Sequence, residues 1–314
     1  MVQANNFGDL PLKYSALNIA KVVIIPVPYD RTSTWIKGAD KGPAAIIQAS
    51  ANMELYDIET DSEVYKIGIY TDKAVEQNSS PENMTEAVEE RVQQHIRKGK
   101  FVVVVGGEHS VSIGSIKAHV ENNKGMRISI LQLDAHSDLR DEYHGSKYNH
   151  ACVMARAKEI APILQVGVRS MDASEKQLMD RKNVFFAEDI YRRRDWVKKV
   201  LSRLSEKVYI TIDLDVFDPA IMPSTGTPEP GGLSWYDCLA LLKTVVDKKN
   251  VVGFDVVELC PSNTNKAPDF LAAKLVYKLL SYKFSQRHEK GKLLKRSRTP
   301  HNKMVKEGQS DGIA

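Results

Sequence analysis

The chain has 314 residues, 42% of them hydrophobic, and a formal net charge of +4. That size and composition suit a globular protein with a substantial core, in one large domain or two smaller ones. Residues 282–314 hold nine Lys and Arg against three Asp and Glu, so the remaining chain is slightly acidic, which argues against a protein whose main task is to bind nucleic acid.

The sequence predicts strands and helices that alternate along most of the chain. Strands are expected where Val, Ile and Leu run together and Gly, Pro or polar residues end the run. They are predicted at 21–29, 65–70, 101–105, 128–133, 162–168, 183–187, 208–214 and 251–257. Helices are predicted at 43–56, 81–98, 113–122, 151–158, 174–181, 189–204, 234–248 and 270–280. Apolar strands between helices indicate a parallel sheet covered on both faces, in one α/β domain.

The cysteines and the start of the chain suggest a compartment. Cys152, Cys238 and Cys260 have no regular spacing, which favours reduced thiols over a disulfide framework. Residues 1–18 lack the charged start and continuous apolar stretch of a signal peptide, and no apolar run reaches membrane-spanning length. A soluble cytoplasmic protein is therefore expected.

Polar clusters follow several predicted strands, at the end where sites form in open α/β sheets. In GGEHS the two glycines permit a tight turn that presents Glu108 and His109. In DAHSD, an extended backbone would project Asp134, His136 and Asp138 to one side, because side chains alternate along a strand. The ordinary alternative is that Asp138 caps the next helix and His136 satisfies a local backbone group.

A third cluster favours a metal site. Asp213 and Asp215 are two positions apart at the end of a buried strand, where they repel each other unless a cation or protons intervene. Two divalent ions that share carboxylates would use six side chains: His109, Asp134, His136, Asp138, Asp213 and Asp215. This oxygen-rich set favours Mn²⁺ over structural Zn²⁺. Because four carboxylates and a hydroxide outweigh two divalent ions, a cationic substrate is favoured over a phosphate.

The chain resembles the ureohydrolase family, which includes arginases and agmatinases, from Val22 to Tyr282. The motifs that carry the resemblance are GGEHS at 106–110, DAHSD at 134–138, IDLDVFDP at 212–219, TGTPEPGGLSW at 225–235 and DVVELCP at 255–261. The resemblance implies a single three-layer α/β/α domain with a mostly parallel sheet of about eight strands. It also implies a homo-oligomer, either a trimer or a hexamer.

The resemblance further implies two Mn²⁺ ions per chain, with Asp134 and Asp213 as bridging ligands. One ion would take His109, Asp134, Asp138 and Asp213, and the other would take Asp134, His136, Asp213 and Asp215. A metal-bridging hydroxide would then attack the carbon of a guanidinium, which is otherwise a poor electrophile.

Two further residues match catalytic positions of the family. His150 matches the histidine that carries a proton to the leaving amine, and Glu258 matches the glutamate that grips the guanidinium. The alternative for His150 is a loop histidine without a role. Asp255 is expected to face away from Glu258 and to support a ligand histidine. Asp218 is expected to form a turn with Pro219. His95, His119 and His144 are expected to be packing or surface residues.

The substrate is the least determined part. Arg140 stands where arginases have an asparagine, and residues 138–151 look more like archaeal and bacterial agmatinases. Asp141 and Glu142 would suit a substrate with a distal ammonium, and the alternative is that either residue simply faces solvent. The prediction is an agmatinase that forms putrescine and urea, with arginine, aminopropylagmatine and a guanidino acid as alternative substrates. Zinc deacetylase-like chemistry, or nucleic-acid binding through the tail without catalysis, are alternatives from other classes.

The sequence departs from the family pattern at two places near the predicted site. Cys260 replaces an asparagine, and Ala151-Cys152 replaces glycine and threonine in many members. The catalytic domain is predicted at 1–282, followed by a basic extension at 283–314.

Overall fold

The computed structural model describes residues 6–285, and these residues contain one sheet of eight parallel strands. The strand order is β2-β1-β3-β8-β7-β4-β5-β6. The strands are β1 Val22–Val27, β2 Ile69–Thr71, β3 Phe101–Gly106, β4 Ile128–Leu133, β5 Ile163–Val168, β6 Val184–Phe186, β7 Lys207–Asp213 and β8 Asn250–Val257. The predicted α/β/α class is confirmed, with a sheet that is wholly parallel.

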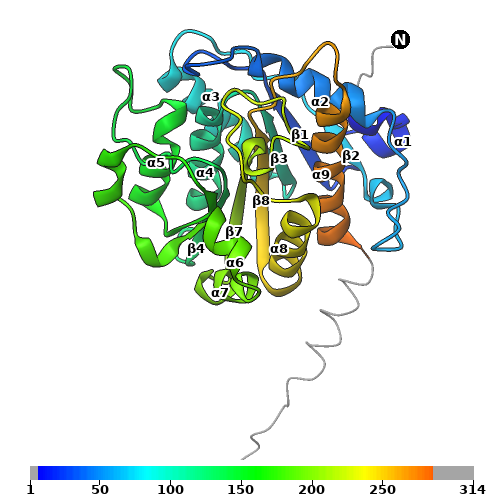
Figure 1. The fold of residues 1–314 in the computed structure, drawn as a ribbon. Coiled ribbons are helices and arrows are strands. Elements are labelled where there is room, and N and C mark those ends of the chain that lie inside the picture. The colour runs from blue at the N-terminus through cyan, green and yellow to red at the C-terminus, as the bar shows by residue number, and fades with distance from the viewer. Residues whose placement is uncertain (1–5, 286–314) are drawn as a thin grey trace, which may run out of the picture.

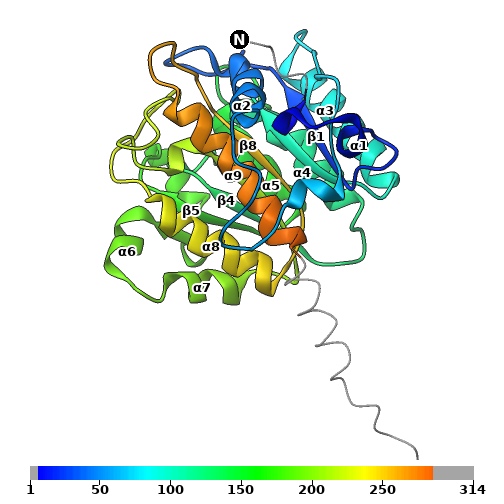
Figure 2. The same ribbon diagram turned by 90° about the vertical axis from the view of Figure 1, so that its right-hand side faces the viewer.

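Helices cover both faces of this sheet (Figures 1 and 2). They are α1 Leu12–Ser15, α2 Gly42–Ser50, α3 Pro81–Arg97, α4 Ser112–Glu121, α5 Val153–Ile160, α6 Ala187–Arg192, α7 Trp196–Arg203, α8 Trp235–Lys248 and α9 Ala267–Phe284. Helices α3, α4 and α5 pack side by side over one face, and α2, α9, α8 and α7 form the opposite layer. The short helices α1 and α6 lie at the sheet edges, beside β2 and β6.

The two helical layers explain why the strands are apolar without interruption. Along β1, Val22 and Ile24 belong to the core beneath α2 and α9, whereas Val23 and Ile25 belong to the core beneath α3. All four side chains are fully buried. Since successive side chains of a strand point to opposite faces, a strand covered on both sides needs apolar residues at every position.

The strand register brings the polar segments together. Strands β3, β8, β7 and β4 are neighbours at the centre of the sheet. Leu133 at the end of β4 pairs with Ile212, and Asp213 at the end of β7 pairs with Val257. Because all four strands run in the same direction, the segments that follow them emerge at one edge.

Several predicted elements were wrong in detail. Predicted helix 174–181 is a short 3₁₀ helix, Ala173–Gln177, followed by a turn. Predicted helix 189–204 is broken into α6 and α7, with Arg193 in extended conformation between them. Three consecutive arginines offer no apolar side chain to bury there, so continuing the helix gains little. Predicted strand 65–70 begins as the 3₁₀ helix Val64–Ile67. Among residues 6–285, no helix has the length and apolar character needed to cross a bilayer.

Candidate metal centre and catalytic pocket

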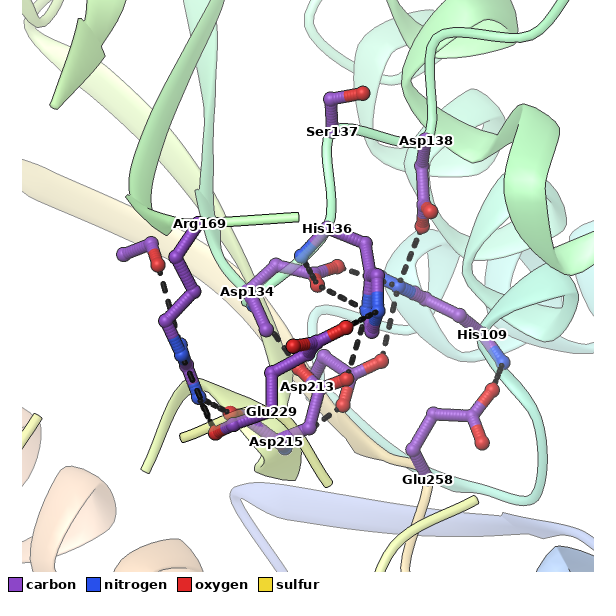
Figure 3. A network of polar contacts seen from close by, with 12 residues as sticks. His109, Asp134, His136, Ser137, Asp138, Arg169, Asp213, Asp215, Glu229 and Glu258 are labelled. Atoms are coloured by element: carbon purple, nitrogen blue, oxygen red, sulfur yellow. Dashed lines mark hydrogen bonds and ion pairs between the residues drawn. The ribbon is translucent and has the colours of Figure 1, made fainter. Parts of the chain in front are cut away.

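A cavity of about 290 Å³ opens at the carboxyl ends of the central strands. It is lined by seven of the eight predicted site residues: His109, His136, Asp138, His150, Asp213, Asp215 and Glu258. The eighth, Asp134, is fully buried and lies within contact distance of both His109 and His136. The fold therefore gathers all eight side chains at one place, most of them visible in Figure 3.

The predicted ligands form two overlapping groups. His109, Asp134 and Asp213 offer atoms within 4.8 Å of one another, and so do Asp134, His136 and Asp215. Asp134 belongs to both groups, which is the arrangement expected of a bridging carboxylate. The bridging role of Asp213 stays a prediction, because Asp213 belongs only to the first group.

The DAHSD segment reaches this geometry by a turn. Strand β4 ends at Leu133, and Asp138 has a φ of 51°, in the left-handed region. The assumption of extended backbone is therefore wrong at Asp138. The turn is held by the buried carboxylate of Glu175, which accepts hydrogen bonds from the Ser137 hydroxyl at 2.7 Å and the Leu139 amide at 2.8 Å. The alternative role of Asp138 as a helix cap is wrong, because the next helical turn is capped by Asn149.

His109 carries the clearest mark of a cation site. Its Nδ1 is buried and has no hydrogen-bond partner. Carboxylate oxygens of Asp134, Asp138 and Asp213 surround this atom at 3.0, 3.1 and 3.4 Å. One imidazole nitrogen and three carboxylate oxygens that converge in this way fit a divalent cation.

The acids of the centre repel one another in the absence of a cation. Burial and the charges of Asp215 and Asp134 raise the pKa of Asp213 well above its ordinary value. Burial and Asp134 likewise raise the pKa of Asp138 to about 7. Although burial opposes the effect, the adjacent imidazoles of His109 and His136 hold the pKa of Asp134 below its usual range. A bound divalent ion relieves this repulsion, since it favours the ionised form of every carboxylate around it.

A buried chain of hydrogen bonds supports His109 from behind. Its Nε2 lies 2.9 Å from the hydroxyl of Thr211, which donates to Asp255 at 2.6 Å. The second carboxylate oxygen of Asp255 accepts from the Tyr209 hydroxyl, also at 2.6 Å. Asp255 thus supports a predicted ligand histidine, as expected, but does so through Thr211.

Glu258 presents its carboxylate to the pocket from a constrained backbone. It follows β8 with a φ of 68°, and its amide donates to the Gly107 carbonyl at 2.7 Å. Oε1 accepts from the His109 amide at 2.6 Å, while no residue in 6–285 forms a hydrogen bond with Oε2. Burial and the nearby charge of Glu108 raise the pKa of Glu258 well above its ordinary value. A cation bound next to this buried carboxylate would stabilise its ionised form.

His150 begins the short turn that leads into α5. Its ring faces Tyr143 edge-on, with the ring centroids 6.1 Å apart. Burial, with the nearby cationic side chains of His136 and His109, lowers the pKa of His150 to about 4. The imidazole is therefore neutral at neutral pH and can accept a proton.

The sequence reasoning missed Arg169, which joins the segment after β5 to both ends of the connection between β7 and α8. Its guanidinium donates to the carbonyls of Asp215 at 2.6 Å and Glu229 at 2.7 Å (Figure 3). It also donates to the Pro230 carbonyl at 2.9 Å. Arg169 follows β5 directly, so its place at the carboxyl end of a predicted strand was the signal available.

Of the two expectations for Asp141 and Glu142, exposure to solvent is the one confirmed, since both are exposed and neither lines the pocket. Asp141 instead pairs with Arg156 at 2.5 Å and Lys147 at 3.2 Å. Arg140 does line the pocket, with its guanidinium 4.4 Å from the centre of the Tyr143 ring.

The other minor expectations hold. Asp218 accepts from the backbone amides of Ala220 and Gly231 at 2.9 Å, as a turn residue does. His95 pairs with Asp72, His119 is buried against Gly253, and His144 is exposed. Cys152, Cys238 and Cys260 are free thiols. The proposed tail begins almost where the described residues end, so its role lies outside them.

The parallel α/β/α fold, with two overlapping groups of His and Asp side chains at the ends of its strands, is that of a metal-dependent hydrolase. Comparison with known proteins gives the family. Residues 20–281 match the model of the Arginase family. An N(1)-aminopropylagmatine ureohydrolase of Synechocystis sp. is 38% identical, over 84% of this chain and 89% of the relative. An agmatinase of Pyrococcus horikoshii is 32% identical, over 86% of this chain and 94% of the relative. The crystal structure of an agmatine ureohydrolase of Thermoplasma volcanium matches with a TM-score of 0.79 and 32% identity, over 92% of this chain and 95% of that one.

The chain therefore belongs to the arginase family and is a ureohydrolase. The resemblance seen in the sequence motifs is confirmed. The individual roles of the site residues, the identity and number of the metal ions, and the assembly into trimers or hexamers stay predictions.

Proposed function

We propose that this ureohydrolase releases urea from a polyamine-type guanidine, with N(1)-aminopropylagmatine as the first candidate and agmatine as the second. The observation that carries the proposal is the pair of overlapping His and carboxylate groups at the floor of a pocket that also presents Glu258. A guanidinium stays protonated at neutral pH. The acidic centre and the free oxygen of Glu258 both favour such a cation over an anionic substrate.

Two Mn²⁺ ions are the proposed cofactors. His109, Asp134, Asp138 and Asp213 would hold one ion, and Asp134, His136, Asp213 and Asp215 would hold the other. The unpartnered Nδ1 of His109 and the excess of carboxylate oxygens support this assignment, because oxygen-rich sites suit Mn²⁺ better than structural Zn²⁺. When bound, such ions lower the pKa of a water molecule and supply the nucleophile at neutral pH.

The protein's own residues would then bind and protonate. The planar carboxylate of Glu258 can accept N–H bonds from the fork of a guanidinium, and its anchored backbone holds it for that contact. His150, neutral and lining the same cavity, would accept a proton and deliver it to the departing amine.

The choice of guanidine rests on the relatives and on Arg140, which lines the pocket. The 38% identical Synechocystis relative bears the name N(1)-aminopropylagmatine ureohydrolase, while the Pyrococcus agmatinase is 32% identical. This reverses the order predicted from the sequence, which placed agmatine first. An arginine substrate would need a receptor for its carboxylate, but Arg140 is already packed on Tyr143 and lies 3.7 Å from the carboxylate of Asp172.

Urea release from four guanidines tests the proposal. The Mn²⁺-loaded protein is assayed with N(1)-aminopropylagmatine, agmatine, arginine and guanidinobutyrate, and kcat/KM should be highest for the first. Preference for arginine would refute the polyamine assignment. Metal analysis of the same sample should give two Mn²⁺ per chain, whereas a single Zn²⁺ with no urea release would instead support deacetylase-like chemistry.

A further inference from the structure

His150, which lines the cavity, contacts the hydroxyl of Thr32. Thr32 Oγ1 lies 2.9 Å from the backbone N of His150 and 3.2 Å from its ring Nδ1. The two residues are 118 positions apart in the chain, so the contact is made by the fold. Thr32 belongs to the loop that follows β1, and the next residues of this loop, Ser33 and Thr34, line the cavity.

Thr32 is in turn fixed by Glu108, a carboxylate with no solvent exposure. Glu108 Oε1 accepts from the Thr32 hydroxyl at 2.5 Å and from the Ser110 hydroxyl at 2.6 Å. Oε2 accepts from the backbone amides of Thr32 at 2.5 Å and Ser33 at 2.9 Å. Four donors thus converge on one buried carboxylate, and two of them are amides that can only donate. This arrangement satisfies the buried carboxylate and leaves Thr32 little freedom to move.

The hydrogen-bond capacity of the Thr32 hydroxyl then decides the state of the histidine ring. A hydroxyl has one proton to donate and two lone pairs. The proton goes to Glu108, and one lone pair accepts the backbone N–H of His150. With Glu108 ionised, the state that its four donors favour, only a lone pair is left to face Nδ1, so Nδ1 carries the proton. The exchangeable position of the neutral ring is therefore Nε2, which has no hydrogen-bond partner among residues 6–285.

We infer that Thr32 is a positioning residue for proton transfer, which, held by Glu108, keeps Nδ1 of His150 protonated and leaves Nε2 as the atom that takes and gives the proton. This inference rests on the proposed function, because it assigns His150 a proton to move. Thr32 remains a hydrogen-bond acceptor for Nδ1 whether the ring is neutral or protonated. The ring therefore need not turn between accepting and delivering the proton.

A double-mutant cycle tests the inference. Thr32→Val removes the hydroxyl with little change of shape, and Thr32→Ser keeps it as the matched control. At saturating metal and substrate, Thr32→Val should lower kcat about tenfold, the loss expected for one orienting hydrogen bond. Thr32→Ser should stay within about threefold of the wild type. Bound metal should be unchanged in both. Thr32→Ser should keep the unfolding midpoint of the wild type, whereas Thr32→Val should lower it, because the His150 amide and the Glu108 carboxylate each lose a partner, and its rate is measured at a temperature where it is folded.

The decisive comparison is made in the His150→Asn background, where Thr32→Val should change kcat less than about twofold. Interacting residues show such non-additivity, and independent ones do not. An equal loss in both backgrounds, or an equal loss in the serine variant, overturns the inference while the ureohydrolase activity stands. If Thr32→Val does not fold, Thr32→Ala completes the same cycle. A wild type that releases no urea from any of the four guanidines refutes the proposed function itself, which is a different result.

Discussion

Thr211→Val should weaken the binding of one divalent ion about 10- to 100-fold. Thr211 Oγ1 lies 2.9 Å from His109 Nε2 and 2.6 Å from the carboxylate of Asp255, and all three side chains are buried. Valine fills the same volume but leaves the imidazole N–H without a partner. An unsatisfied buried polar group costs about 1–3 kcal/mol. In the metal-free protein the ring can turn to relieve this cost, whereas a bound ion fixes the ring, so the cost falls on the bound state.

That magnitude agrees with the general effect of such supports. Removing a hydrogen-bond partner of a ligand histidine lowers metal affinity about 10- to 100-fold, and a factor of ten corresponds to about 1.4 kcal/mol. The loss should be confined to the ion held by His109. His136 does not contact Thr211. The affinity for the ion held by His136 should therefore stay within about threefold of the wild-type value.

Calorimetric titration of metal-free protein with Mn²⁺ measures both affinities. Thr211→Ser is the control, because it keeps the hydroxyl at the same backbone position in β7. The serine variant should bind both ions as the wild type does. If Thr211→Val also binds both ions normally, the hydrogen bond does not support the ligand and the reasoning is refuted.

Three further variants test other parts of the molecule. Asp213→Ala should lose metal together with urea release, since its carboxylate lies 3.4 Å from His109 Nδ1, and metal analysis after dialysis checks this. Glu258→Gln should keep its metal but lose about 10- to 100-fold in kcat/KM, the cost of a weakened bond to a charged group; unchanged hydrolysis would disprove the assigned grip. Burial lowers the pKa of His119 to about 4, so the stability of the neutral ring is complete above the unfolded pKa of about 6.5 and is lost as the pH falls toward 4. His119→Phe should therefore reduce the fall in unfolding free energy over this interval by roughly 3 kcal/mol. Denaturant titrations at several pH values measure this free energy for both proteins, and an equal fall with pH in both would contradict the prediction.

The sheet could be predicted because its signal is local. Each of the long strands is a run of Val, Ile and Leu that ends in glycine or polar residues, and both faces of the sheet demand such residues. Short elements were harder. The pattern at 189–204 is helical in composition, but the break at Arg193 depends on what the neighbouring residues can bury. Only the packed structure contains that information.

The site was predictable in its ligands and less so in its supports. Carboxylates at alternate positions after a strand indicate a metal site in the sequence, because their mutual repulsion needs a cation. The sequence does not indicate the roles of Arg169 and Glu175, since each binds backbone groups distant in the chain. Arg169 binds the carbonyl of Asp215, and Glu175 binds the amide of Leu139. The place of Asp141 could not be decided from the sequence for the same reason, because its partner Arg156 lies on the following helix.

His109 and His150 are each held by a threonine that donates to a buried carboxylate, but the threonine contacts a different ring nitrogen in each case. A threonine whose proton is taken by a buried carboxylate can only accept from an imidazole. Thr211 with Asp255 accepts from Nε2 of His109, which frees Nδ1 for the carboxylate cluster. Thr32 with Glu108 accepts from Nδ1 of His150, which frees Nε2 for proton exchange.

The same chemical change should therefore have two separable effects. Thr211→Val should alter metal affinity, and its kcat should recover when Mn²⁺ is raised to saturation. Thr32→Val should leave metal affinity unchanged, and its kcat should stay low at any Mn²⁺ concentration. Steady-state rates measured across a Mn²⁺ series distinguish the two. If both variants recover at high metal, Thr32 also serves the metal centre, and the division between ion binding and proton transfer does not hold.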